Sequence, residues 1–113
     1  MHPLPSAGEI LVVEDPMIGK LVRGILRRFG YTVSVCDIPE TLARMRSGNR
    51  VMVITNTPAP FLEFAGAVPL LYLGASPDPD LAGHFRRCCT LAKPFHPRDL
   101  LNAVRQLAEA GVP

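Results

Sequence analysis

The strongest constraint on the fold is a short apolar run near the N-terminus that ends abruptly at two acids. Residues 10–13 read Ile-Leu-Val-Val, and Glu14 and Asp15 follow directly. An unbroken run of this length is typical of a strand that is buried on both faces of a parallel sheet. Helices must then cover both faces of that sheet, so the remaining chain is expected to alternate between helices and strands.

The remaining chain shows this alternation. After Pro16, apolar residues recur at the spacing of one helix face until Gly30, which ends the pattern. The apolar positions of this first helix are Ile18, Leu21, Val22, Ile25 and Phe29. Further strands are expected at residues 31–36, 51–55, 69–73 and 88–92, and further helices at 37–46, at 81–87 and from Pro97 onward.

The third crossover is short. Thirteen residues, 56–68, separate the third and fourth strands, and five of these form a proline-rich loop. A parallel crossover normally needs about a dozen residues or more, including its helix. We therefore expect a shortened third helix that leaves Phe61 and Phe64 partly exposed.

These elements predict an α/β fold: a flavodoxin-like, five-stranded parallel sheet in the order 2-1-3-4-5 with helices on both faces. Residues 1–9 are expected to form a loose tail, and residues 10–113 one domain. In such sheets, sites form beyond the carboxyl ends of the strands where the strand order reverses. That rule brings together Glu14, Asp15 and Asn56, with Gly74 and Lys93 nearby.

Composition excludes several classes of protein. Apolar residues make up 48% of the chain and charged residues 19%, which is enough hydrophobic surface for a core. A net charge of +2 is too small to favour nucleic acid as the partner, and no apolar stretch is long enough to span a membrane. Three cysteines without framework spacing favour a reducing compartment, so we expect a cytoplasmic protein.

The chain resembles the receiver domains of bacterial two-component response regulators between residues 10 and 110. The matching segments are residues 10–15 (ILVVED), 30–33 (GYTV), 68–71 (VPLL) and 93–95 (KPF), together with Pro60, four places beyond Asn56. The resemblance implies an acidic pair that helps to hold Mg²⁺, an aspartate that accepts a phosphoryl group from a histidine kinase, and a lysine that contacts the phosphoryl oxygens. It also implies a cis peptide bond before Pro94.

Three positions depart from the family pattern. Asn56 occupies the phosphoacceptor position, Gly74 replaces the switching serine or threonine, and Thr90 replaces the reporting aromatic residue. A neutral amide is a poor nucleophile, and Mg²⁺ prefers anionic oxygen ligands. We therefore expect no phosphorylation at Asn56 and at most weak Mg²⁺ binding by Glu14 and Asp15, with Lys93 paired to one of these two acids.

These residues predict a stand-alone, degenerate receiver domain that is not an enzyme and has no required cofactor. It would act by binding a histidine kinase, a phosphotransfer protein or another receiver. By the resemblance, the fourth and fifth strands with the last helix form the interface, and a homodimer across it is possible. We interpret the basic face of the first helix as a solvated surface, and the resemblance implies docking against the helical hairpin of a histidine kinase as the alternative.

Two alternatives stay open. In the first, the protein is a conventional phosphoryl acceptor that uses Asp15, Thr55 or Thr57. In the second, it is a flavodoxin-like binder of a nucleotide or flavin. The second alternative lacks a glycine-rich phosphate loop after the first strand. The spacing of His84 and the adjacent Cys88 and Cys89 does not match a zinc site, so we interpret them as a surface histidine and core cysteines.

Overall fold

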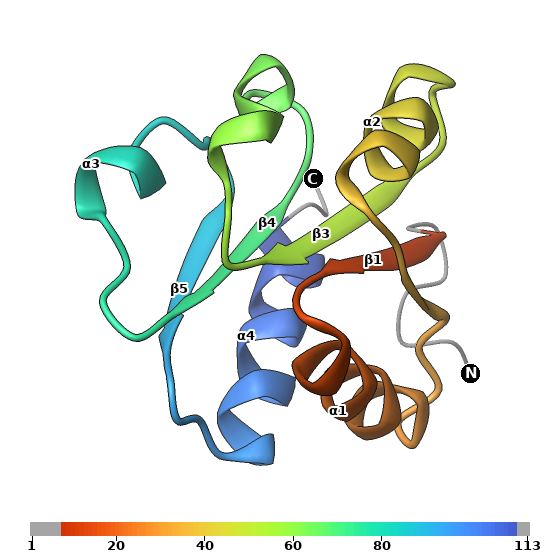
Figure 1. The fold of residues 1–113 in the computed structure, drawn as a ribbon, viewed down its shortest axis with the longest axis vertical. Coiled ribbons are helices and arrows are strands. Elements are labelled where there is room, and N and C mark those ends of the chain that lie inside the picture. The colour runs from red at the N-terminus through yellow and green to blue at the C-terminus, as the bar shows by residue number, and fades with distance from the viewer. Residues whose placement is uncertain (1–7, 111–113) are drawn as a thin grey trace.

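The computed structural model describes residues 8–110, which form a parallel sheet between two helical layers (Figure 1). The strands are β1 (Glu9–Val13), β2 (Val33–Val35), β3 (Val51–Thr55), β4 (Leu70–Gly74) and β5 (Cys88–Ala92). The helices are α1 (Pro16–Arg27), α2 (Ile38–Arg46), the 3₁₀-helix η1 (Ala59–Phe64), α3 (Pro79–Ala82) and α4 (Pro97–Ala110). The strand order β2-β1-β3-β4-β5, with parallel neighbours throughout, confirms the predicted fold class.

The sheet separates two hydrophobic cores. Figure 1 shows α1 and α4 on one face and α2 and α3 on the other. Ile10 and Val12 of β1 pack into the core beneath α1 and α4, whereas Leu11 packs with Phe61 in the other core. Neighbouring residues divide in this way because successive side chains of a strand point to opposite faces.

Local signals explain where the helices begin. The Asp15 carboxylate accepts hydrogen bonds from the backbone amides of Met17 and Ile18, and Pro16 occupies the first helical turn of α1. Asp37 caps α2 in the same manner through the amide of Glu40. No helix within residues 8–110 combines the length and apolarity needed to cross a bilayer.

The third crossover is reduced as predicted, but its aromatic residues are placed differently. It contains the six-residue 3₁₀-helix η1 in place of an α-helix. Phe61 is completely buried, so its predicted partial exposure is wrong, whereas Phe64 is partly exposed as expected. The Phe61 amide donates to the carbonyl of Pro58 at 2.8 Å, and this tight turn directs the ring into the core.

Several predicted boundaries need correction. The helix expected at 81–87 is instead the four-residue α3, because Asp78 caps a helix that starts at Pro79 and ends before Gly83. The strand expected at 31–36 is limited to β2, and β4 is shifted one residue later than predicted. Glu9 is the first residue of β1, so the predicted tail is one residue too long there, and its residues 1–7 lie outside the described part of the chain.

The first helix buries less of its apolar face than its spacing predicts. Leu21 is 51% exposed and Phe29, just beyond the helix, is 48% exposed, while Met17 at the start is 80% exposed. Val22 and Leu26 are fully buried. The apolar pattern of α1 therefore serves two surfaces, the core and an outer face beside the candidate site.

Candidate functional site

Four side chains predicted to meet do lie at the carboxyl ends of neighbouring strands. Glu14 and Asp15 follow β1, Asn56 follows β3, and Lys93 follows β5. Val13 pairs with Thr55 in the β1–β3 register, so the next residue of each strand lies at the same edge of the sheet. Gly74 ends β4, and its carbonyl accepts the Lys93 amide at 2.9 Å.

An ion pair connects the first and last of these strands. Lys93 Nζ lies 2.9 Å from Glu14 Oε2, which is one of the two predicted pairings. The Glu14 side chain has no exposed surface, and that of Lys93 is 24% exposed. Glu14 Oε2 accepts no hydrogen bond of good geometry. Its contact with Lys93 Nζ is therefore close enough for an ion pair but is not aligned as a hydrogen bond. Glu14 Oε1 accepts the amide of Asp15 at 3.2 Å.

The second acid has a structural role. Asp15 Oδ1 accepts the amides of Met17 and Ile18, both at 3.1 Å. Three of the four carboxylate oxygens of the acidic pair therefore already have partners within the chain. Mg²⁺ prefers anionic oxygen ligands in near-octahedral geometry, and within the described residues Asp15 Oδ2 is the one oxygen of the pair without a protein partner to compete with such an ion.

The predicted acceptor position carries an exposed amide. Asn56 Oδ1 accepts the hydroxyl of Thr57 at 2.9 Å. The Thr55 hydroxyl is fully buried, donates to the carbonyl of Val13 at 2.8 Å and accepts the amide of Thr57 at 3.0 Å. Burial and these two bonds disfavour Thr55 as an acceptor, whereas Asp15 and Thr57 are exposed.

Gly74 and Thr90, the two positions predicted to be degenerate switch residues, lie on β4 and β5. Thr90 is exposed on β5, opposite Tyr72 of β4. A side chain added at Gly74 would contact the Tyr72 ring at 3.7 Å. The Lys93–Pro94 peptide bond is cis, as the resemblance implies.

Sequence analysis missed an apolar groove beside the site. It has a volume of about 340 Å³ and is lined by Ile18, Leu21, Lys93, Pro94 and Phe95. One wall comes from α1 and the other from the segment between β5 and α4. The exposed Met17 and Leu21 side chains on the same helix were the available signal, because apolar residues there exceed what the core can bury.

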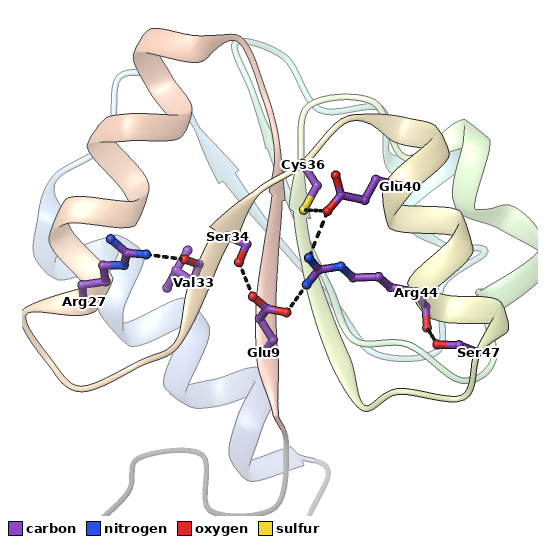
Figure 2. Close-up of polar contacts among 8 residues, drawn as sticks. All are labelled: Glu9, Arg27, Val33, Ser34, Cys36, Glu40, Arg44 and Ser47. Carbon is purple, nitrogen blue, oxygen red and sulfur yellow. Dashed lines mark hydrogen bonds and ion pairs between the residues drawn. The ribbon is translucent and has the colours of Figure 1, made fainter.

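A second polar cluster lies at the opposite end of β1. Glu9 contacts the Ser34 hydroxyl and the Arg44 guanidinium, and Arg44 also pairs with Glu40 at 2.9 Å (Figure 2). Cys36 Sγ lies 3.5 Å from the same Glu40 carboxylate, and burial raises the pKa of this thiol to about 11. Glu9 begins β1 and Glu14 follows it, so this network ties α2 to the sheet without joining the site.

The remaining candidate ligands do not converge. Cys88 packs in the core on the α3 face of the sheet and Cys89 in the core on the α4 face, on opposite faces as their adjacent positions predict, and His84 is exposed. Burial raises the pKa of Cys88 to about 11 and also raises the pKa of Cys89. Among the residues that the structure describes, no three His, Cys, Asp or Glu side chains form a group that would hold a metal ion.

No protein-family model matches the sequence, and no curated protein matches it. Solved structures do. The chemotaxis response regulator CheY4 of Vibrio cholerae is 24% identical with a TM-score of 0.71, over 90% of this chain and 99% of that chain. A signal receiver domain of an HD domain-containing protein from Pseudomonas fluorescens Pf-5 is 22% identical with a TM-score of 0.72, over 92% of this chain and 88% of that chain.

A putative response regulator from Chloroflexus aurantiacus is 20% identical with a TM-score of 0.71, over 92% of this chain and 99% of that chain. The similarity therefore extends over almost the whole length of CheY4 and of the Chloroflexus aurantiacus regulator. The fold is that of response-regulator receiver domains.

Proposed function

We propose that this chain is a receiver-like module of two-component signalling that is not phosphorylated at the usual position and acts by binding another protein. The observation that carries the proposal is the combination of Asn56 with the Glu14–Lys93 ion pair. In the family that the chain resembles, the residue at the position of Asn56 accepts the phosphoryl group, the residue at that of Glu14 helps to hold Mg²⁺, and the lysine at that of Lys93 contacts the phosphoryl oxygens. Here the acceptor is an amide, and the lysine lies 2.9 Å from a carboxylate with no exposed surface.

The chemistry supports a pocket with one fixed state. Phosphoryl transfer to a carboxylate needs an anionic oxygen nucleophile and positive charge that neutralises the incoming group. Asn56 lacks the anion, and Lys93 would have to leave a buried acid uncompensated before it could contact a phosphoryl oxygen. Asp15 can offer only Oδ2 to a metal ion while Oδ1 caps the first turn of α1.

The docking surface in this proposal is the groove between α1 and the segment after β5. Its walls are apolar, and the neighbouring Met17 and Leu21 are 80% and 51% exposed. The rest of α1 carries Lys20, Arg23 and Arg27 and no acidic residue. An apolar groove bordered by positive charge is complementary to an amphipathic helix with acidic flanks. A histidine kinase, a phosphotransfer protein or another receiver would have to present such a helix to bind here.

The test compares the wild type with Asn56→Asp. Both proteins are incubated with acetyl phosphate and Mg²⁺ and their intact masses are measured, and both are titrated with beryllofluoride by amide NMR. We expect no phosphoryl adduct on the wild type. A beryllofluoride response confined to Asn56→Asp would show that the carboxylate at this position is the missing component.

A phosphoryl adduct on the wild type would overturn the proposal and would favour a non-standard acceptor such as Asp15 or Thr57. Fragmentation of the adduct would locate it. As a control, Asn49→Asp introduces the same change at an exposed position between α2 and β3, and it should leave both measurements unchanged.

A further inference from the structure

The two edges of the sheet are protected to different degrees. The β2 edge is only three residues long, and the outward carbonyl of Val33 accepts a hydrogen bond from Arg27 Nη2 at 3.2 Å (Figure 2). Short length and a covering side chain are both devices that prevent an edge strand from pairing with another chain.

The β5 edge has neither device. It is five residues long, reads Cys-Cys-Thr-Leu-Ala, and carries no charged residue and no proline. Its neighbour in the sheet is β4 alone. The helix before it, α3, is only four residues long, and both Thr90 and Ala92 are exposed.

The register of β5 fixes which of its backbone groups face outward. The carbonyl of Arg87 accepts the amide of Leu70 at 2.9 Å, and the amide of Lys93 donates to the carbonyl of Gly74 at 2.9 Å. Groups alternate along a parallel strand, so the odd-numbered residues 87–93 are directed toward β4. The amides and carbonyls of Cys88, Thr90 and Ala92 therefore point away from the sheet.

These outward groups form a self-complementary set. The three amides and three carbonyls of Cys88, Thr90 and Ala92 have no backbone partner among residues 8–110, because β4 bonds only to the odd-numbered residues of β5. Consider a second β5 that pairs antiparallel with the first, with the two-fold axis at Thr90. Thr90 of one copy then faces Thr90 of the other, and Cys88 of each copy faces Ala92 of the other. Each facing pair exchanges two bonds, so the pairing satisfies all twelve groups of the two strands in six hydrogen bonds.

We propose that two copies of this chain associate through β5 into one continuous ten-stranded sheet, an inference that does not depend on the state of Asn56. Two copies can pair without charge repulsion between the strands, because β5 contains no charged residue. The flanking cations are directed into their own chain: Lys93 pairs with Glu14, and Arg87 Nη2 donates to the carbonyl of Leu107 at 3.1 Å. Such a two-fold arrangement buries the same edge of both subunits.

Sedimentation equilibrium of the full chain over a range of concentrations tests the association. We expect the mass of two chains for the wild type and of one chain for Thr90→Pro, because proline removes an outward amide that β4 does not use. Thr90→Lys keeps the backbone intact and places two ammonium groups face to face, so it too should be monomeric. A wild type that is monomeric at every concentration, or a dimer that survives Thr90→Lys, would overturn the proposal.

Crosslinking and hydrogen exchange locate the contact. In a Cys88→Ser/Cys89→Ser background, a short bifunctional thiol reagent should link Thr90→Cys into a dimer, because facing residues of this kind lie about 5.5 Å apart between Cα atoms. Gly66→Cys is the control, since a side chain added there meets nothing within 4 Å and the position is exposed. The Thr90 amide should become protected as concentration rises, whereas the Val35 amide on the opposite edge should not; equal protection at both edges would refute the assigned interface.

Discussion

Removal of the Lys93 ammonium tests the ion pair at the centre of the candidate site. In Lys93→Met the side chain keeps its apolar stem, but Glu14 loses the cation that lies 2.9 Å from Oε2. Exposed pairs contribute about 0–1 kcal/mol, whereas loss of one member of a buried pair costs about 3–5 kcal/mol. Glu14 has no exposed side-chain surface and Lys93 is 24% exposed, so the pair lies between these cases.

We expect Lys93→Met to lower the free energy of unfolding by about 2 kcal/mol, halfway between these ranges. At roughly 4 °C per kcal/mol for a domain of this size, the melting temperature should fall by roughly 8 °C. Lys20→Met, a matched change at an exposed position of α1, should alter the free energy of unfolding by no more than about 0.5 kcal/mol.

A double-mutant cycle separates the ion pair from other effects of the substitution. Urea denaturation gives the free energies of unfolding of the wild type, Lys93→Met, Glu14→Gln and the double variant. Because Glu14→Gln removes the orphaned charge, the double variant should be more stable than the single changes predict, with a coupling energy of about 1–2 kcal/mol. Additivity to within about 0.3 kcal/mol would refute the reasoning that the two groups are coupled.

Two further predictions concern the core and the thiols. Phe61→Ala should lower the free energy of unfolding by about 3–5 kcal/mol because it empties a fully buried site, whereas Leu62→Ala, at a residue that is 41% exposed, should cost far less in the same urea experiment. The folded protein holds the pKa of Cys36 and Cys88 near 11, above the usual value of 9.0, so the unfolded chain loses these protons first as the pH rises. Stability contributed by these thiols is therefore complete below pH 9 and should decline between about pH 9 and pH 11, and a Cys36→Ala/Cys88→Ala variant that declines as steeply as the wild type would contradict this explanation.

The sequence was sufficient for the features that local chemistry determines. The starts of α1 and α2 follow from Asp15 and Asp37, whose carboxylates cap the backbone amides two to three residues later. The succession of parallel strands follows from short apolar runs separated by crossovers, whereas their spatial order was taken from the likeness to flavodoxin-like sheets. The choice of Glu14 as the partner of Lys93 was also accessible in principle, because an aspartate before Pro16 is a helix cap and is therefore already engaged.

The features that sequence analysis missed depend on contacts between distant segments. The burial of Phe61 depends on how tightly η1 turns over the sheet, and a proline-rich crossover does not reveal that geometry. The exposure of Leu21 depends on how much of α1 the sheet and α4 cover, whereas a helical apolar pattern indicates only that the residues share a face. The groove beside Lys93 forms between α1 and the segment that follows β5, so the apolar residues of α1 could indicate one wall but not the groove itself.

The two helical layers are unequal in a way that bears on how the domain opens. One face of the sheet is covered by α1 and α4, of twelve and fourteen residues, while the other carries a nine-residue α2, the six-residue η1 and the four-residue α3. Segments with few buried contacts unfold locally at the lowest free energy. Transient excursions of this domain should therefore begin on the lightly covered side and expose the strands there, while the opposite half remains assembled as a scaffold.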